Sequence, residues 1–581
     1  LTSIVTELIR ILDMNLTPEE REAGRESFHA AVGDVSRRGF LKGGLAAGMV
    51  SAGSLGAFYF GYEKAEGNPL RVGVLGTGDE GSVLIGAVTP DYIHIKSIAD
   101  IRPYNVHRAF HGDIYSDAAL AARPGLMAKY GWKTEDEARK HVAVYGDYQE
   151  LIANAKKDGL EGVIIALPLH LHAPAAIAAM KAGLHVLTEK LMGHSVHECK
   201  EMGRTAEQTG LYLAVGHQRH YNILYHEAME AIRRGILGDL HYIRAQWHRG
   251  NLPGTDSWQQ PLPKKSKPDD ALAKELAAKL ASWERALEGA GGRDIDLWQR
   301  RVDQLKAQIR DEIVDAVKFG YEDAEYKDRA GKVVYRRPAI EELIRWRLWN
   351  RTGGGLMAEL GSHQLDAASI FVSAMHGGHK QHPLSVVAAA NRPLFPPDRE
   401  VEDHVYCLLE FPAPGYDPKD AVNRMKKIGV QYASINGNGF GGYGEIVYGT
   451  RGTLILDREK EVMLYRDASA SKVSVGKTAG PTMDTQASGP PQAAAAAGGP
   501  SPDVSRGYTE EMEHWAWCIR NPAPENQPRC GPKVAMGDAI IALTTNVAAR
   551  EGKRIEFMEA WFDMDSDETP EGVKPDLSRY S

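Results

Sequence analysis

Residues 68–88, NPLRVGVLGTGDEGSVLIGAV, constrain the fold more than any other stretch of this sequence. An apolar strand over residues 71–75 runs into Gly76, Gly78 and Gly81, and an apolar helix follows. The first glycine permits a tight turn, the second lets a pyrophosphate approach the backbone, and the third lets the helix pack on the strand. Phosphates would lie at the helix N-terminus, where amides and the helix dipole favour negative charge. The stretch predicts a dinucleotide-binding unit; the alternative is a glycine turn in an α/β domain that binds no nucleotide.

The next strand bears on which dinucleotide is bound. This strand, IHIKSIAD, ends at Asp100, 24 residues after Gly76 (100 − 76). An acid at this strand end is placed to accept hydrogen bonds from ribose hydroxyls, which favours NAD, while the nearby Arg102 leaves NADP open. We therefore expect NAD to contact the following residues: Gly76, Thr77, Gly78, Gly81, Asp100 and Arg102.

Strands and helices continue to alternate over residues 161–192 and 210–222. This alternation predicts a doubly wound parallel sheet, a Rossmann domain over residues 67–220, in which ligands bind at the carboxyl ends of the strands. Five residues stand at such ends and are candidate cofactor contacts: Pro168, His170, Glu189, Lys190 and His217.

A polar stripe marks the second half of the chain. Residues 353–368, GGGLMAELGSHQLDAA, carry Glu359, His363 and Asp366 at spacings of four and three, so all three would share one face of an α-helix. Buried carboxylates and imidazoles are costly unless they are paired or used. From these residues alone, the stripe is a catalytic helix, a solvated helix face, or a metal site of the form E-x-x-x-H-x-x-D.

Three motifs in this order resemble the Gfo/Idh/MocA oxidoreductases: the strand with its G-x-G-x-x-G, the segment ALPLHLHAPAAIAAMKAGLHVLTEK, and the GGG…ELGSHQLD helix. The resemblance covers about residues 69–250 and 340–465, and more loosely 507–557. The family's E-K-P is here Glu189-Lys190-Leu191, and its D-x-G-x-H-x-x-D here begins with Glu359. The resemblance implies a Rossmann domain followed by a C-terminal α/β domain with an open, mostly antiparallel sheet. That sheet often forms an oligomer interface, so a homo-oligomer is expected.

The resemblance further implies NAD(P)-dependent oxidation of a hydroxyl on a sugar, sugar derivative or cyclitol. Lys190 or His363 would take the hydroxyl proton, and Glu359 and Asp366 would bind the substrate or orient the imidazole. No metal is expected. Two alternatives stay open: an NAD-dependent glycoside hydrolase that oxidises its substrate transiently, and a non-catalytic cofactor-binding protein that acts as a scaffold.

The N-terminal region carries a targeting pattern. Residues 36–42, SRRGFLK, precede a Gly/Ala-rich uncharged stretch and resemble a twin-arginine export signal. We expect a leader over residues 1–66 and recognition of Arg37 and Arg38 by the twin-arginine export machinery. The protein would then be periplasmic, or attached to the membrane on its periplasmic side by an uncleaved segment; a cytoplasmic protein with a basic helix start is the alternative.

The remaining regions indicate how the chain is divided into domains and do not point to further catalytic or binding residues. A second domain is expected over residues 221–467, with a charged helical insertion at 253–340, a flexible linker at 468–506 and a helical segment and tail at 507–581. The formal net charge of −8 and the absence of zinc-finger spacing argue against nucleic-acid binding. Four cysteines without a CxxC indicate neither a disulfide framework nor a Cys-rich metal site.

Overall fold

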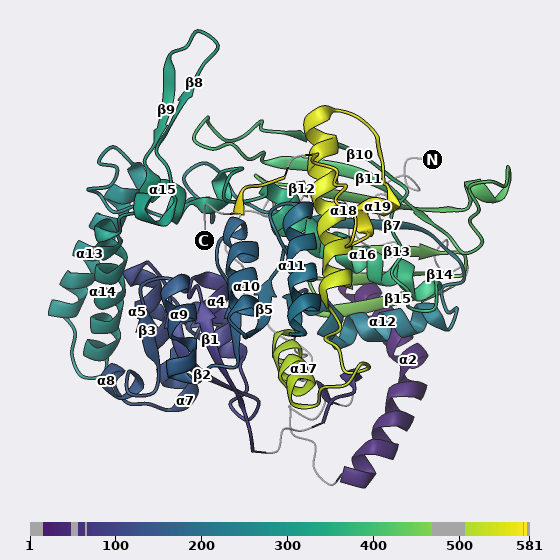
Figure 1. The fold of residues 1–581 in the computed structure, drawn as a ribbon, viewed down its shortest axis with the longest axis horizontal. Helices are drawn as coiled ribbons and strands as arrows, with labels where there is room; N and C mark the ends of the chain where they lie inside the picture. The colour runs from purple at the N-terminus through teal and green to yellow at the C-terminus, as the bar shows by residue number, and fades with distance from the viewer. Residues whose placement is uncertain are drawn as a thin grey trace.

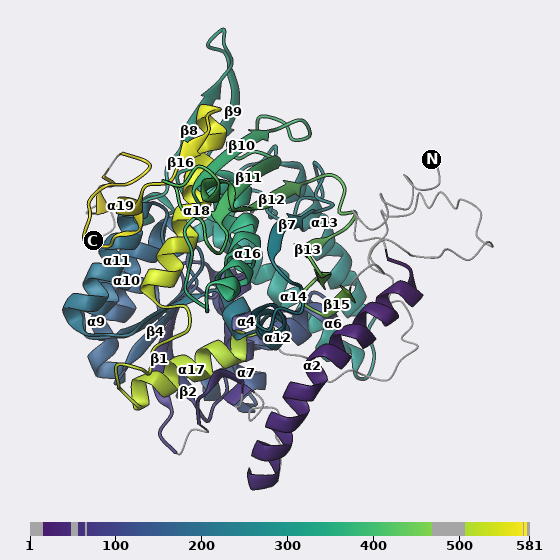
Figure 2. The ribbon, with the colours of Figure 1, turned by 90° about the vertical axis from the view of Figure 1, so that its right-hand side faces the viewer.

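Two α/β domains lie side by side, and a C-terminal helix runs between them (Figure 1, Figure 2). The computed structural model describes residues 16–47, 56–57, 59–63, 67–466, 506–572 and 574–577. The helix between the domains, α18 (Pro532–Glu551), packs against α11 (Val196–Thr209) of the first domain. It also packs against β10 (Ser385–Asn391) and α16 (Ser362–Met375) of the second. The predicted fold class, a Rossmann domain followed by a domain with an open, mostly antiparallel sheet, is confirmed.

The first domain is a six-stranded parallel sheet of order β3-β2-β1-β4-β5-β6. This is the strand order of dinucleotide-binding folds, in which ligands bind where the order reverses, beyond the carboxyl ends of β1 and β4. The strands are β1 (Leu70–Leu75), β2 (Ile93–Ala99), β3 (Ala143–Tyr145), β4 (Gly162–Ile165), β5 (His185–Glu189) and β6 (Leu213–Gly216). The principal connecting helices, besides α11, are α4 (Asp79–Ala87), α5 (Pro103–His111), α9 (Tyr148–Asp158) and α10 (His172–Lys181). Every residue of β4 is buried, because helices cover both faces of the sheet.

The second domain is an eight-stranded sheet of order β15-β14-β13-β7-β12-β11-β10-β16. Its neighbouring strands are antiparallel except for β7 and β12, which run parallel. Helix α16 packs on this sheet, and α12 (Ile223–Arg233) packs on α16. The remaining strands are β7 (Leu240–Trp247), β11 (His404–Pro412), β12 (Lys427–Ile435), β13 (Tyr443–Gly449), β14 (Gly452–Asp457), β15 (Glu461–Arg466) and β16 (Ile555–Glu556). Side chains along β11 alternate between buried and more exposed, so one face of the sheet is more exposed than the other.

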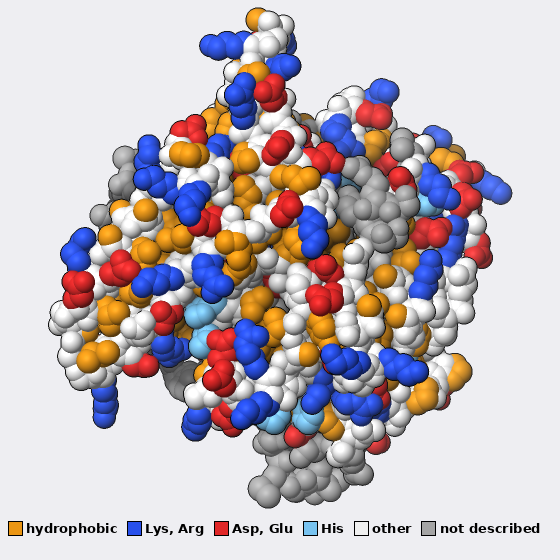
Figure 3. Space-filling view, turned by 60° about the vertical axis from the view of Figure 1, so that its left-hand side comes forward, with side chains coloured by type: hydrophobic (Ala, Val, Ile, Leu, Met, Phe, Trp, Pro, Cys, Tyr) orange, Lys and Arg blue, Asp and Glu red, His pale blue; other side chains and the backbone are white. Residues whose placement is uncertain are grey.

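The insertion packs against the Rossmann domain. Its two predicted helices are present as α13 (Ala271–Glu288) and α14 (Asp294–Arg310), and α14 lies against α5. A hairpin that was not predicted, β8 (Ala324–Lys327) with β9 (Val333–Arg337), projects from the molecule (Figure 1). In the space-filling view, side chains of both charge signs are interspersed over the face that carries this hairpin (Figure 3).

The N-terminal helix α2 (Pro18–Ala47), within the predicted leader, packs against β15 of the second domain. Arg21 Nη1 donates to Asp457 Oδ2 over 2.7 Å, and Gly24 lies so close to Tyr465 that any side chain at 24 would displace the ring. The predicted signal, residues 36–42, falls within α2, but its side chains lie outside the described part of the chain. Among the described helices, none is both long and apolar enough to cross a bilayer.

The predicted C-terminal helices return to the core. Helix α17 (Tyr508–Arg520) packs on the Rossmann sheet, with the ring of Trp515 close against Gly162. Strand β16 then extends the second sheet beside β10. Residues 467–505, which contain most of the predicted linker, lie outside the described residues. Short helices complete the fold: α6 (Asp117–Ala122), α7 (Gly125–Tyr130), α8 (Glu135–Ala138), α15 (Ala339–Ile344) and α19 (Glu559–Phe562).

Candidate active site

A cavity of about 1030 Å³ opens between the two domains at the carboxyl ends of the Rossmann strands. The glycine loop and β5 supply one wall, and the segment that precedes α16 supplies the opposite wall. A third side comes from the insertion, whose residues 317–321 reach over the cleft from the end of α14. The two helices of the insertion, α13 and α14, do not line the cavity, but the loop that follows α14 does.

The glycine loop has the shape that a pyrophosphate requires. Gly76 has a φ of +84°, and a Cβ there would lie 2.5 Å from the carbonyl oxygen of Ala166. A Cβ at Gly81 would lie 2.1 Å from the carbonyl oxygen of Gly76, so helix and strand pack too closely for a side chain. At Gly78, by contrast, a Cβ would meet only Asn105 Nδ2 at 3.7 Å and would project into the cavity that a dinucleotide would fill. The loop fits NAD in the manner predicted.

Asp100 and Arg102, both predicted to lie near the ribose, differ in whether their side chains are free to bind it. Asp100 lines the cavity, and its Oδ2 accepts a 2.8 Å hydrogen bond from the backbone N–H of Thr77, which holds the glycine loop in place. Arg102 donates from Nε to Asp311 Oδ2 over 2.9 Å, and its side chain is only 8% exposed. Because Arg102 is already neutralised by an acid of the insertion, the site suits a ribose hydroxyl better than the 2′-phosphate of NADP.

The predicted residues at the other strand ends separate into two groups. Pro168, Glu189 and Lys190 line the cavity. His170 is buried outside it, with Nδ1 3.3 Å from the carbonyl oxygen of Thr352 and its ring edge-to-face with Tyr321. His217 also lies outside the cavity lining. Neither histidine that was predicted to contact the cofactor therefore lines the cavity, although both follow strands whose ends converge on it.

Lys190 and Glu359 meet across the cleft. Lys190 Nζ donates a 2.9 Å hydrogen bond to the backbone carbonyl oxygen of Glu359, and Arg347 Nε donates a 2.8 Å hydrogen bond to Glu359 Oε2. Burial alone would raise the pKa of the Glu359 carboxyl, but the charges of Arg347 and Lys190 lower it below its usual value. The Glu359 side chain is thus a carboxylate that is hydrogen-bonded to Arg347 and further stabilised by the nearby charge of Lys190.

His363 faces the same cavity as a neutral imidazole. Burial, followed by the nearby charges of Lys190 and Arg219, lowers the pKa of His363 well below its ordinary value. Its ring centroid lies 5.5 Å from that of Trp247, and Arg219 donates to its backbone carbonyl. Among the described residues, Nδ1 of His363 has no hydrogen-bond partner, so this nitrogen is free for a substrate hydroxyl.

Asp366, the third residue of the predicted polar stripe, does not line the cavity, whereas Glu359 and His363 do. Glu359 lies in a π-helical turn, Met357–Gly361, and His363 and Asp366 lie in the α-helix that follows it. Asp366 is buried behind the cavity, with Oδ1 2.8 Å from His220 Nε2.

Several residues that line the cavity were not predicted from the sequence. Arg347 holds Glu359, although nothing in its local sequence distinguishes it from other surface arginines. Glu80 follows the glycine loop, and with burial its charge raises the pKa of the Glu189 carboxyl to about 8. The acidic pair DE at 79–80 was visible directly after GTG and could have drawn attention to this position.

The fold and cavity are those of a Rossmann-type dinucleotide-binding domain. Residues 70–217, about a quarter of the chain, match the model of the oxidoreductase family with an NAD-binding Rossmann fold, Gfo/Idh/MocA. The resemblance drawn from the motifs and the expectation of NAD as the cofactor are confirmed.

Curated relatives match parts of the chain. A glycosyl hydrolase family 109 protein of Stenotrophomonas maltophilia is 29% identical over 182 residues, which cover 31% of this chain and 36% of that protein. A 1-carboxy-3-chloro-3,4-dihydroxycyclohexa-1,5-diene dehydrogenase of Comamonas testosteroni is 36% identical over 104 residues, 18% of this chain and 25% of the relative. The chain thus spans about a third or less of the length of these two relatives.

Among solved structures, the aldose–aldose oxidoreductase from Caulobacter crescentus complexed with glycerol is similar at 17% identity and a TM-score of 0.47. That comparison covers 84% of this chain and all of the solved one.

Proposed function

We propose that this protein is an NAD-dependent oxidoreductase that acts on a hydroxyl of a sugar, sugar derivative or cyclitol. The observation that carries the proposal is the cavity shared by the glycine loop, Lys190 and His363. A substrate held there would have the cofactor on one side and two proton-handling side chains on the other.

Each side chain of the cavity has a separable task. When bound, NAD supplies the hydride acceptor. The neutral imidazole of His363 can accept a hydroxyl proton at Nδ1, and the ammonium of Lys190 can stabilise the developing alkoxide. The backbone carbonyl of Glu359 holds Lys190 Nζ, while the Glu359 carboxylate is held by Arg347 and can accept a hydrogen bond from a second hydroxyl.

The substrate side of the cavity is both polar and aromatic. Arg249, Asn251 and Gln260 line it together with the indole rings of Trp247 and Trp258. Hydroxyl groups find donors and acceptors on such a surface, and the C–H faces of a ring can pack on an indole. This combination supports a polyhydroxylated ring as the substrate class.

A glycoside hydrolase with transient oxidation is the second candidate. Two observations favour it: the curated relative named as a glycosyl hydrolase family 109 protein, and Glu189, whose raised pKa of about 8 keeps a protonated carboxyl in the cavity at neutral pH. A protonated carboxyl can serve as the general acid for a leaving alcohol.

A panel of free sugars, cyclitols and aryl glycosides, each with and without added NAD, tests the proposal. Net NADH formation from a free sugar or cyclitol is the expected result. Release of aglycone without net NADH would identify the glycosidase. A protein that binds NAD but turns over no member of either panel would support the third interpretation, a non-catalytic scaffold.

A further inference from the structure

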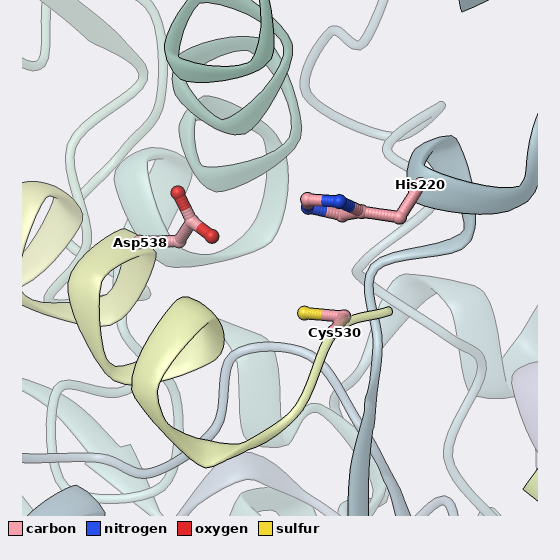
Figure 4. A group of neighbouring side chains, drawn as sticks. All are labelled: His220, Cys530 and Asp538. Carbon is pink, nitrogen blue, oxygen red and sulfur yellow. The ribbon is translucent and has the colours of Figure 1, made fainter. Parts of the chain in front are cut away.

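Five side chains with metal-binding atoms converge behind the catalytic helix, outside the cavity. They come from three parts of the chain: His217 and His220 follow β6, Asp366 lies on α16, and Cys530 and Asp538 lie just before and within α18. In Figure 4, the imidazole of His220, the thiol of Cys530 and the carboxylate of Asp538 point toward a common centre. None of the five lines the active-site cavity.

The distances suit a single small ion. One ligand atom from each of His220, Cys530 and Asp538 lies within 4.8 Å of the others, and the same holds for His217, Asp366 and Asp538. The two groups share Asp538 and adjoin each other at its carboxylate. Bond lengths of ~2.0–2.3 Å in a tetrahedral zinc site place neighbouring ligand atoms about 3.3–3.8 Å apart, so small side-chain movements would complete a coordination shell.

Buried polar atoms of this cluster lack partners. His217 is 1% exposed, yet neither of its ring nitrogens has a hydrogen-bond partner among the described residues. Its Nδ1 lies 3.5 Å from Asp366 Oδ2, too far for a good hydrogen bond. Within the same described part of the chain, Asp366 Oδ2 and Asp538 Oδ2 are also unpaired. Buried unpaired polar groups are costly and call for a specific explanation.

The two acids of the cluster are fully buried, and their second oxygens have no donor. Lys380 forms an ion pair with Asp538 Oδ1. Among the described residues, Oδ2 of Asp366 and Oδ2 of Asp538 accept no hydrogen bond. Each of these oxygens is therefore available to a bound cation.

We propose that His217, His220, Asp366, Cys530 and Asp538 form a binding site for one divalent transition-metal ion, most readily Zn²⁺. Imidazole and thiolate are ligands that Zn²⁺ accepts, whereas Mg²⁺ and Ca²⁺ require mainly oxygen ligands. The ion would replace the direct contact between His220 Nε2 and Asp366 Oδ1, which now lie 2.8 Å apart.

The site would have a structural task. It links the end of the Rossmann sheet, the catalytic helix α16 and the interdomain helix α18, which lie far apart in sequence. An ion held by all three would fix α18 between the domains and hold α16 in the position that presents His363 to the cavity. The metal would bind the folded chain, whereas the unfolded chain has no preformed site. Binding would therefore raise the unfolding temperature.

The test uses the full chain, freed of metal with a chelator and then titrated with Zn²⁺ or Co²⁺. We expect about one ion per chain and a higher unfolding temperature. With Co²⁺, we expect the intense visible bands of a low-coordinate site and a near-ultraviolet thiolate charge-transfer band. Cys530→Ser should abolish the thiolate band, and Asp538→Asn should weaken Zn²⁺ binding by more than about 100-fold. Cys407→Ser, a buried cysteine elsewhere, should leave binding and spectrum unchanged.

The proposal is overturned if the metal-free full chain takes up no stoichiometric Zn²⁺ or Co²⁺. It is equally overturned if Cys530→Ser and Asp538→Asn, folded by circular dichroism, bind Zn²⁺ like the unmodified chain. In either case the five side chains would form a buried hydrogen-bonded network. NAD binding, measured in the same samples, reports separately on the proposed oxidoreductase function.

Discussion

Lys190 and Glu359, 169 positions apart in sequence, are joined by a hydrogen bond from Nζ of the lysine to the backbone carbonyl oxygen of the glutamate, over 2.9 Å. Lys190 follows the last residue of β5, and Glu359 lies in the π-helical turn that leads into α16. The bond therefore connects the Rossmann domain to the second domain across the cavity. A lysine at this position is oriented before any substrate arrives, which lowers the cost of arranging it in the transition state.

Lys190→Ala and His363→Ala should each lower turnover on the true substrate by about 10²–10⁴-fold, the usual contribution of a general acid or base. Both variants should keep NAD binding, since the pyrophosphate and ribose are held by the glycine loop and Asp100. In the double variant, the fold-loss of turnover should be smaller than the product of the two single losses, because both residues act on one proton transfer. Steady-state kinetics and NAD titration measure these effects.

Lys181→Ala, at the exposed last residue of α10 in the same domain, is the matched control and should retain full turnover. Near-normal turnover of Lys190→Ala would remove Lys190 from the mechanism and shift the chemistry to His363 and Glu359.

The cofactor site could be predicted from the sequence because its determinants are local. Gly76, Gly78 and Gly81 have their roles set by a few neighbouring backbone atoms, so three spacings suffice to locate them. The polar stripe was predicted in part. Glu359 and His363 line the cavity but Asp366 does not, because the cavity borders only part of the helix face, and that depends on how the helix packs.

Contacts between residues far apart in the sequence could not be predicted from the sequence. The docking of α2 on β15 depends on Gly24 and Tyr465, residues whose letters alone indicate no contact. The proposed metal site is assembled from residues over 300 positions apart, His217 to Asp538 (538 − 217), without any of the short ligand spacings that identify zinc sites. Such a cluster can be recognised only when the positions of the helices in three dimensions are known.

Gly78→Val should abolish NAD binding without unfolding the protein. The cavity leaves room for the new side chain, so the Rossmann fold should survive, but the isopropyl group would occupy the place of the pyrophosphate. Isothermal titration with NAD measures the loss. Gly291→Val, in an exposed turn of the insertion with open space around it, is the control and should bind NAD normally. Unchanged affinity in Gly78→Val would disprove the assignment of the loop.

Glu189 should make the protein less stable as the pH rises from about 4.5 to about 8. Burial, with the charge of Glu80 next, raises the pKa of its carboxyl from 4.5 to about 8. The native state therefore holds this proton more tightly than the unfolded chain, and its contribution to stability is complete below the unfolded pKa and lost on approach to the folded pKa. Unfolding temperatures from pH 5 to 8 should fall less steeply in Glu189→Gln. Exposed Glu207→Gln should follow the unmodified slope, and an equally steep fall in Glu189→Gln would refute the assignment.

We propose that the chain is exported in folded form under the direction of Arg37 and Arg38. Lysine at both positions keeps the charge but removes the pattern that the export receptor reads. Fractionation of cells that express the double variant should show the protein retained in the cytoplasm. Replacement of Arg21 and Arg25 by lysine, in the same helix but outside the motif, should leave export unchanged. Normal export of the Arg37→Lys, Arg38→Lys chain would point to another route or to a cytoplasmic protein.

Arg219 is expected to be among the most sensitive positions for stability. Its side chain is 1% exposed, with Nε donating to Glu459 Oε1 over 2.9 Å and Nη1 to Glu445 Oε1 over 3.2 Å. Arg219→Met keeps the side-chain volume but leaves both acids buried with one fewer cation. The free energy of unfolding should fall by about 3–5 kcal/mol, the usual cost of breaking a buried ion pair from one side. Urea denaturation measures this loss.

The exposed pair of Arg233 with Glu230 offers the matched comparison, because Arg233→Met removes an arginine from a helix surface and should cost about 0–1 kcal/mol.

A second variant distinguishes two causes of the stability loss: the missing attraction to the arginine, and the burial of a carboxylate that no longer has a cation beside it. If the penalty of Arg219→Met arises from the unpaired Glu445, then adding Glu445→Gln should restore part of the stability, since a neutral amide costs less to bury than a carboxylate. Equal losses for Arg219→Met and Arg233→Met, or no recovery on adding Glu445→Gln, would show that the buried cluster does not hold the junction between the domains.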